Sequence, residues 1–435
     1  MLTLKDLRGS SVDAASVLPR ASQDISATIE TVAPILDDVR QRGVSALMQY
    51  SEKFDGVRPP SIRVPAEKLR EAADQLSAEV REALETLILR AREVHNAQLP
   101  AASVVSPGPD AQVTNRWAPI RRVGLYVPGG QAVYPSSVVM NVVPAQVAGV
   151  RSLAIASPPQ KDFGGLPHPT ILGAAHLLGI EEVYAVGGAQ AVGMFAYGAR
   201  DEAGTQVCPP VSLITGPGNI FVATAKRAVQ GVVGIDAEAG PTEIMVLADE
   251  TGKAPLIASD LISQAEHDAL AAAVLVTTSM PLAQAVMEQV EVQARSTLHA
   301  ERVKQALTGS QSAVLVVDTM EQAVEIANAY GAEHLEVMTA DDAAVVEEIH
   351  NAGAVFLGDF TPVSLGDYCA GSNHVLPTGG ASAYSSGLNV SSFLRSQQVV
   401  HYGESGLRQV AAHVTALAQA EGLPAHGEAV EARFR

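Results

Sequence analysis

The sequence contains few cysteines, few aromatic residues and no long apolar run. Of its 435 residues, 2 are cysteines and 4% are aromatic. Cys208 and Cys369 can form one disulfide at most, which excludes a disulfide-stabilised scaffold and favours a reducing compartment where both are plain thiols. No uninterrupted stretch of about 18 apolar residues occurs, so no transmembrane helix is expected. The opening residues MLTLKDLRGS include no apolar segment with a cleavage site, and we expect a cytoplasmic protein.

Positive charge is also scarce. Lysine and arginine number 29 against 47 aspartate and glutamate residues, for a formal net charge of −18. This balance disfavours a nucleic-acid partner, because the overall electrostatic term would be repulsive, although a local basic patch is compatible with it. Hydrophobic residues make up 47% of the chain, which is typical of a globular protein. The length exceeds that of an ordinary single core and predicts two or more domains.

The order of apolar and polar residues predicts an α/β fold with two parallel-sheet units of Rossmann-like type. Helical spacing of apolar positions occurs first at 25–42, 66–75 and 78–98. Short apolar runs followed by Gly or Pro then begin at 121, and they alternate with helical stretches as strands and helices do in a parallel sheet. These helical stretches are 170–178, 189–197 and 220–229. The pattern resumes with strands expected at 244–248, 273–277, 313–317, 335–338 and 354–357, and a helix at 260–268.

The C-terminal segment differs from both units. Beyond residue 388 a weakly apolar stretch leads to an amphipathic helix expected at 406–421, followed by a polar end. So short a tail cannot bury a core of its own. We therefore expect it to pack on another domain or on another subunit.

Gln264 and His267 stand three residues apart on the helix predicted around 260–268. This spacing places both side chains on one face, where a metal ion could bridge them. Glutamine is an unusual ligand, and a solvated helix face explains such a pair equally simply. The pair alone is weak evidence for a metal site.

The dipeptide Glu333-His334 lies where a predicted helix passes into a predicted strand. Loops at strand boundaries are common positions for catalytic groups in α/β enzymes. A neutral imidazole can accept an alcohol proton, and a carboxylate can activate water. The alternative is a surface turn.

The segment LGDYCAGSNHVLPTGG has the unusual composition of a site loop, with Asp367 and His374 among glycines and few long charged side chains. Asp367 suits a borderline metal bound by nitrogen and oxygen donors, but aspartate also caps turns. Near the end of the chain, Glu421 and His426 stand five apart around Pro424. By themselves they are typical of a helix end without function.

The glycine-rich turns of the first unit give a weaker signal. In GPGNIF, Gly216 and Gly218 follow a predicted strand, but Phe221 occupies the place of the third glycine of the dinucleotide fingerprint, and no suitably spaced acidic residue follows. The fingerprint is therefore absent. This turn, GGAQAVG and VPGG could each hold phosphate with free N–H groups. Any parallel sheet needs such turns, so they leave cofactor binding open.

The motifs LYVPGG, GGAQA, GPGN, AGPTE, SQAEH, YGAEHLE, GDYCAGSNHVLPT and AEGLPAH occur in the order found in the histidinol dehydrogenase family, which the sequence resembles from about residue 25 to its end. The resemblance implies a zinc- and NAD-dependent homodimer that oxidises L-histidinol to L-histidine in two hydride transfers through histidinal. It also implies four parts. These are an N-terminal extension (1–24), a discontinuous α/β domain with most of the metal and catalytic site (25–125 and 243–387), an inserted NAD-binding α/β domain (126–242) and a helical tail exchanged across the dimer (388–435).

The resemblance assigns roles position by position. It implies zinc ligation by Gln264, His267 and Asp367 of one subunit and by His426 of the other, without a cysteine. It implies that His334 takes the alcohol proton and that Glu333 activates water on the aldehyde. Besides His334 and the four ligands, the implied substrate contacts are Thr242, His374 and Glu421, and the implied NAD contacts are Tyr126, Gln190 and Asn219.

Thr242 departs from the family pattern, which usually has serine in AGPSE. The hydroxyl is kept and a methyl group is added beside the substrate. Three alternatives to histidinol oxidation remain. They are a relative that oxidises another polar alcohol, which His374 and Glu421 disfavour, a zinc hydrolase that uses Glu333 without NAD, and a noncatalytic metal-stabilised dimer. Mn²⁺ would also suit the nitrogen and oxygen donors.

Overall fold

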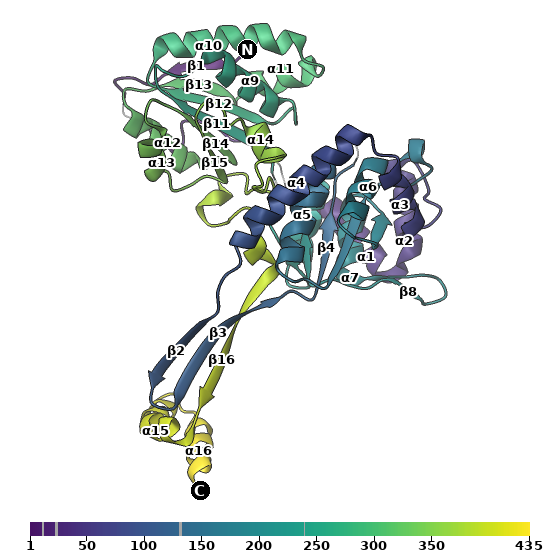
Figure 1. Ribbon diagram of the computed structural model, residues 1–435, viewed down its shortest axis with the longest axis vertical. Coiled ribbons are helices and arrows are strands. Elements are labelled where there is room, and N and C mark those ends of the chain that lie inside the picture. The colour runs from purple at the N-terminus through teal and green to yellow at the C-terminus, as the bar shows by residue number, and fades with distance from the viewer. Residues whose placement is uncertain (11–12, 22–24, 130–132, 239) are drawn as a thin grey trace.

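The structure, a computed structural model, describes residues 1–10, 13–21, 25–129, 133–238 and 240–435. It contains two parallel sheets covered by helices and a separate antiparallel sheet (Figure 1). The predicted α/β class with two parallel-sheet units is confirmed. The predicted extension 1–24 and the VPGG turn each include residues outside these ranges. None of the described helices is long and apolar enough to cross a bilayer.

The larger sheet has six parallel strands in the order β1-β13-β12-β11-β14-β15. Alternate residues of β11 face opposite sides, with Ile244 and Val246 in one core cluster and Met245 and Leu247 in the other. Both clusters are closed by helices, so β11 is apolar from Ile244 to Ala248. The strands are β1 (Thr3–Asp6), β11 (Glu243–Ala248), β12 (Ala272–Thr277), β13 (Ala313–Val316), β14 (His334–Met338) and β15 (Ala354–Leu357). The helices are α9 (Ala254–Ala265), α10 (Met280–Gln293), α11 (Ala300–Thr308), α12 (Met320–Tyr330), α13 (Asp342–Glu347) and α14 (Val363–Asp367).

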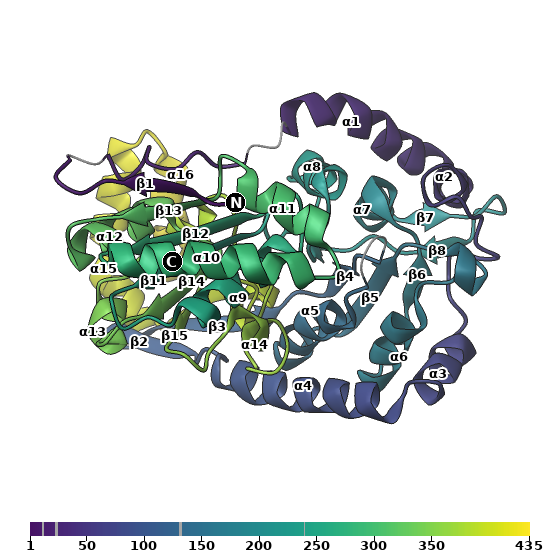
Figure 2. The ribbon, with the colours of Figure 1, turned by 90° about the horizontal axis from the view of Figure 1, so that it is seen from above.

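The smaller parallel sheet has five strands in the order β10-β9-β4-β5-β6. Helices α1, α7 and α8 lie along one face, and α3 to α6 lie along the other (Figure 2). The strands are β4 (Arg122–Tyr126), β5 (Ser152–Ser157), β6 (Val183–Ala185), β9 (Leu213–Thr215) and β10 (Gly234–Ile235), with a hairpin of β7 (Ala199–Arg200) and β8 (Gln206–Cys208) beside them. The helices are α1 (Ile25–Arg42), α2 (Val44–Tyr50), α3 (Ala66–Asp74), α4 (Ala78–Ala97), α5 (Pro135–Val147), α6 (Pro169–Leu177), α7 (Gly188–Tyr197) and α8 (Ile220–Val229).

The packing of the N-terminal third differs from the predicted division of the chain. Helix α1 packs on α7 and α8, α3 on α6, and α4 on α5, so helices α1 to α4 belong with the five-stranded sheet rather than with residues 243–387. Strand β1, predicted as part of a separate extension, pairs with β13 and forms an edge of the six-stranded sheet. Helical periodicity reveals that a segment has an apolar face, but not which sheet that face covers.

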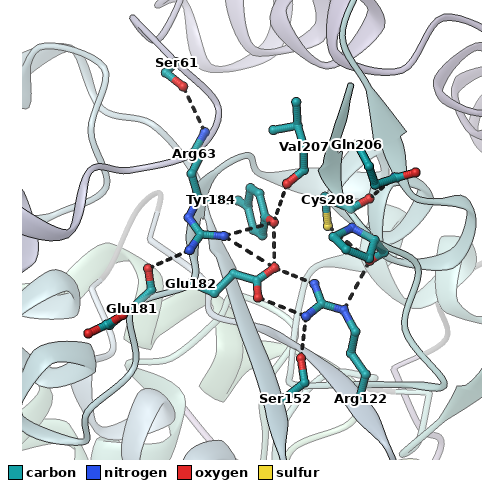
Figure 3. Close-up of polar contacts among 11 residues, drawn as sticks. Ser61, Arg63, Arg122, Ser152, Glu181, Glu182, Tyr184, Gln206, Val207 and Cys208 are labelled. Atoms are coloured by element: carbon teal, nitrogen blue, oxygen red, sulfur yellow. Dashed lines mark hydrogen bonds and ion pairs between the residues drawn. The ribbon is translucent and has the colours of Figure 1, made fainter. Parts of the chain in front are cut away.

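The amino ends of the five-stranded sheet are tied together by a polar network (Figure 3). The Arg122 guanidinium at the start of β4 donates to the Glu182 carboxylate, at 2.9 Å from Nη1, and to Ser152 at the start of β5. The Tyr184 hydroxyl donates to Glu182 at 2.6 Å. Burial raises the pKa of the nearby Cys208 thiol to about 11, and both cysteines are free thiols, as expected.

A long arm projects from the body of the molecule (Figure 1). It is an antiparallel sheet in the order β16-β3-β2, formed by β2 (Ser103–Gly108), β3 (Ala111–Pro119) and β16 (Leu394–Tyr402). The arm ends in α15 (Glu404–Ala420) and α16 (Pro424–Glu431), which pack on each other. The weakly apolar stretch after 388 thus includes a strand. The expected packing of the tail on another domain is seen only at its start, where Val390 and Phe393 are buried in the core of the five-stranded unit. Helices α15 and α16 lie at the far end of the arm (Figure 1).

Candidate active site

A cavity of about 850 Å³ lies between the two parallel-sheet units. Ten of the twelve predicted site residues line it: Tyr126, Gln190, Asn219, Thr242, Gln264, His267, Glu333, His334, Asp367 and His374. A largely apolar cavity with a few convergent polar groups, at the junction of two α/β units, is a common place for a ligand. The structure therefore brings together residues that are more than 200 positions apart in the sequence.

Glu333 and His334 are fixed by the backbone of Glu243 at the start of the neighbouring strand β11. The Glu243 N–H donates to Glu333 Oε2 at 3.1 Å, and the Thr242 hydroxyl donates to the same oxygen. His334 Nδ1 lies 3.1 Å from the Glu243 carbonyl oxygen, which can only accept, so Nδ1 carries the proton. His334 Nε2 is buried and has no hydrogen-bond partner among the described residues. This nitrogen is thus a free proton acceptor.

The surroundings shift the pKa values of this pair in opposite directions. Burial raises the pKa of the Glu333 carboxyl to about 7, against the hydrogen bonds from Thr242 and Glu243, and the Asp367 carboxylate raises it further. Burial lowers the pKa of His334, which keeps its imidazole neutral. Such opposed shifts are typical of acid–base groups in enzymes.

Gln264, His267 and Asp367 approach the pair from the six-stranded unit. Gln264 lies in the last turn of α9 and is 1% exposed. Its amide nitrogen donates to the Thr242 hydroxyl, which leaves its side-chain oxygen available. His267 follows α9, and Asp367 is the last residue of α14. Electrostatic effects of both His267 and Asp367 reach Glu333, so the three groups are close neighbours.

These donors fit a metal such as zinc in chemical type. They supply a glutamine oxygen, an imidazole nitrogen and a carboxylate oxygen, a set suited to Zn²⁺ or Mn²⁺. Within the described part of the chain, no group of three or more His, Cys, Asp and Glu residues could hold a metal by itself. Gln264, His267 and Asp367 together supply three donors, and tetrahedral coordination needs a fourth.

His374 links the two units across the cavity. Its Nδ1 lies 3.0 Å from the Asp367 carbonyl oxygen, and its Nε2 lies 3.1 Å from the Ser137 hydroxyl on α5. Because Nδ1 donates to a carbonyl, Nε2 accepts from Ser137. Burial lowers the pKa of His374, which agrees with a neutral ring.

The predicted cofactor contacts lie on the opposite wall, which belongs to the five-stranded unit. The Tyr126 hydroxyl accepts the Gly188 N–H at 3.1 Å, and burial raises its pKa to about 12. The Gln190 amide nitrogen is buried without a partner among the described residues. Asn219 caps α8 by accepting from the Phe221 and Val222 N–H groups. Gln190 thus offers an unused donor to a ligand.

Comparisons with known proteins agree with this arrangement. The histidinol dehydrogenase family model matches residues 18–434. A histidinol dehydrogenase of Thermobifida fusca is 59% identical over 99% of this chain and 97% of its own length. One from Mycobacterium tuberculosis (strain H37Rv) is 56% identical over 100% and 98%. The crystal structure of histidinol dehydrogenase from Elizabethkingia anophelis superposes with a TM-score of 0.93 at 31% identity, covering 100% of this chain and 98% of that one.

The chain belongs to the histidinol dehydrogenase family. It is therefore an enzyme and an oxidoreductase, as the sequence motifs predicted. The agreement of the family model over almost the whole chain includes the arm and its terminal helices.

Two residues implied by the histidinol dehydrogenase resemblance do not line the cavity. Glu421 follows α15 and His426 lies in α16, both exposed at the end of the arm. The arm carries them away from the body of their own chain (Figure 1). Their predicted roles are compatible with this structure only in the site of another subunit.

Several cavity residues were not predicted from the sequence, among them Asp55, Ser137, Lys226 and Asp236. Asp55 and Ser137 have no motif around them that indicates a site. Lys226 is different, because a lysine within the apolar stretch IFVATAKRAV invites the question of its partner. That partner, Asp236, is ten residues away and could not be identified by periodicity.

Proposed function

We propose that this enzyme oxidises L-histidinol to L-histidine through L-histidinal, with zinc and NAD, in a homodimer that exchanges its arms. The observation that carries the proposal is the buried Glu333–His334 pair, with one unprotonated imidazole nitrogen, facing a cavity whose other wall has unused polar groups. Membership of the chain in the histidinol dehydrogenase family also supports L-histidinol as the substrate.

The proposed chemistry adds one water and removes two hydrides from the carbinol carbon. In the first oxidation His334 Nε2 takes the hydroxyl proton of the alcohol while a hydride leaves. Glu333 then takes a proton from the water as its oxygen adds to the aldehyde carbon, giving the anion of the hydrate, which becomes the carboxylic acid when the second hydride leaves. A carboxyl with a pKa of about 7 is suited to this role, because it both gains and releases a proton near neutral pH.

Zinc and NAD each have a set of proposed contact residues. Gln264, His267, Asp367 and the partner subunit's His426 would hold zinc, and Tyr126, Gln190 and Asn219 would contact NAD. When bound, zinc orients and polarises the substrate and NAD accepts the hydrides. Thr242, His374 and the partner's Glu421 would contact L-histidinol.

The shape of the chain supports arm exchange. Val105 and Val400 flank Val113 in the register of the arm strands, and both are exposed, so one face of the arm presents an apolar surface. In a twofold dimer each arm would reach the partner, and symmetry would generate two identical shared sites. Gln264, His267 and Asp367 supply three donors, and the partner's His426 would be the fourth.

The decisive experiment follows NADH formation with L-histidinol and with a panel of amino alcohols and diols. We expect turnover with L-histidinol that stops when the metal is chelated. Preference for another alcohol would favour a relative with a different substrate. Hydrolysis without NAD would favour the zinc hydrolase, although a cavity wall with Tyr126 and Gln190 has no evident use in that reaction.

A further inference from the structure

Both backbone polar groups of Gly216 are held by one buried ion pair. The Gly216 N–H donates to Asp236 Oδ2 at 2.8 Å, and Lys226 Nζ donates to the Gly216 carbonyl at 3.1 Å. Lys226 and Asp236 also form an ion pair, and their side chains are only 2% and 6% exposed. All three residues line the cavity. We call this arrangement the Gly216 clamp.

The clamp acts where the chain turns sharply from β9 into α8. Gly216 has φ +115°, and a Cβ at this position would lie 2.0 Å from the Tyr126 carbonyl oxygen. Only glycine tolerates that conformation and that contact. A flexible residue in such a turn gains order from bonds to its peptide groups. The residues after it, 217–219, form the cavity wall and begin α8.

The charges of the clamp also matter to an anionic ligand. Asp236 alone would place a buried carboxylate beside the turn and the N-terminus of α8. Lys226 neutralises it at direct contact. Without Lys226 the carboxylate would repel a phosphate group, and the low polarity of the site would strengthen that repulsion.

We propose that Lys226 and Asp236 are positioning residues for the dinucleotide, because they fix the 216–219 turn and keep it electrically neutral. This inference rests on the proposed use of NAD. The clamp is separate from Glu333 and His334, and it acts on cofactor binding rather than on the reacting atoms.

The chain provides a matched control close by, one residue after Lys226 and two residues after Asp236. Arg227 and Glu238 form a more exposed ion pair, with 3.6 Å between nitrogen and oxygen and side chains 53% and 34% exposed. An exposed pair of this kind contributes little to stability. Removing its charges tests whether any ion pair at the end of α8 affects the cofactor.

The experiment measures NAD and L-histidinol binding by calorimetry in the metal-loaded dimer. The variants are K226M, K226M/D236N and R227M/E238Q, each checked for folding by circular dichroism. K226M/D236N removes both buried charges and keeps an acceptor for the Gly216 N–H. We expect its NAD affinity to fall about 10-fold or more, as for a lost hydrogen bond to a charged group. K226M should lose more, because Asp236 stays charged. L-Histidinol affinity should change little, and R227M/E238Q should resemble the wild type.

Two outcomes would contradict the proposed role of the Gly216 clamp in NAD binding. One is a folded K226M/D236N protein with wild-type NAD affinity, and the other is an equal loss of affinity for NAD and for L-histidinol. If K226M alone does not fold, the double variant decides. A wild-type enzyme that binds no NAD contradicts the proposed function itself.

Discussion

The two parallel sheets contribute opposite ends to one cavity. In the five-stranded sheet, Tyr126 ends β4 and Gly216 follows β9, so the site uses the carboxyl ends, as is usual in open α/β sheets. In the six-stranded sheet, Thr242 precedes β11 and His334 begins β14, so the site uses the amino ends. The two ends thus present different groups to the cavity, with glycine turns on one side and a buried carboxyl–imidazole pair on the other.

The difference follows from the groups that each end makes available. The carboxyl ends of β6 and β9 lead through glycine turns into the starts of α7 and α8, whose first N–H groups have no acceptor within the helix. Side chains accept those of Gly188, Phe221 and Val222. At the amino end of β11, the N–H and carbonyl of Glu243 bind the side chains of Glu333 and His334 instead. Backbone groups at a strand end can therefore fix catalytic side chains. On the five-stranded sheet the amino ends are occupied by the Arg122–Glu182 network (Figure 3).

Removal of the metal by chelation should have the largest effect. It should affect the wall of the cavity formed by the six-stranded unit and leave the wall formed by the five-stranded unit unchanged. If the metal is held by Gln264, His267 and Asp367, its removal should abolish turnover, while far-UV circular dichroism stays unchanged because each unit has its own core. NAD should still bind to the wall of the five-stranded unit. Undiminished NAD reduction after verified metal removal would contradict the zinc assignment.

Substitution of Glu333 and of His334, at the amino ends of the six-stranded sheet, should test whether the two residues act in different oxidation steps. Glu333→Gln keeps an oxygen for the Thr242 and Glu243 donors but cannot take a proton. It should slow histidinal oxidation by about 10²–10⁴-fold and histidinol oxidation to histidinal only modestly. His334→Asn should impair both steps. Single-turnover kinetics with each substrate test this, and equal losses for both substrates in Glu333→Gln would refute separate roles.

Much of the fold could be predicted because its periodic patterns are strong. The helix expected at 220–229 is α8, and five strands of the six-stranded sheet begin and end within a residue or two of their expected positions, whereas β1 was not expected. Which sheet helices α1 to α4 cover could not be predicted, because the apolar face of a helix does not indicate the surface on which it packs. The strand β16 was also missed, because its pairing with β3 joins residues far apart in the chain.

Site residues that lie in a recognisable sequence motif could be predicted. Contacts that form only when distant segments come together on folding could not. The ten predicted residues that line the cavity all belong to the motifs quoted from the sequence. Motifs gave no sign that Glu243 fixes His334 through its backbone, which any residue type could do. The Gly216 clamp was missed for a related reason. Its partners belong to different elements, and only the sheet brings them together.

Mixing two inactive variants should test whether the arm of one subunit completes the site in the body of the other. His267→Asn damages the body, and His426→Asn damages the arm, so each dimer should be nearly inactive alone. After joint unfolding and refolding, about half the dimers should be mixed, with one site intact and the other carrying both lesions. Recovered activity should approach roughly a quarter of wild type. Mixed dimers, verified by differential tags, that show no recovery would mean that His426 does not serve the partner.

The smallest expected effect concerns a buried carboxyl pair behind the amino ends. Glu336 in β14 accepts the Val363 N–H at 3.0 Å, where α14 begins, and it interacts with Asp260 of α9. The pair thus connects three elements that carry site residues. Burial, together with the Asp260 carboxylate, raises the pKa of Glu336 well above its ordinary value of 4.5.

This raised pKa gives stability a defined pH dependence. Below about pH 4.5 Glu336 is protonated in both states, so it contributes no difference; above that value the unfolded chain loses the proton while the folded chain keeps it. Folding is therefore increasingly penalised as the pH rises towards the folded pKa. Glu336→Gln removes this linkage and keeps an oxygen for Val363. The fall in Tm between about pH 5 and pH 8 should shrink by roughly 2 °C or more in this variant. Calorimetry of Glu336→Gln beside Glu325→Gln, an exposed carboxylate on α12, measures it. Parallel Tm curves for wild type and Glu336→Gln would show that Glu336 is already ionised in the folded enzyme, and that the amino ends tolerate a buried charge behind the site.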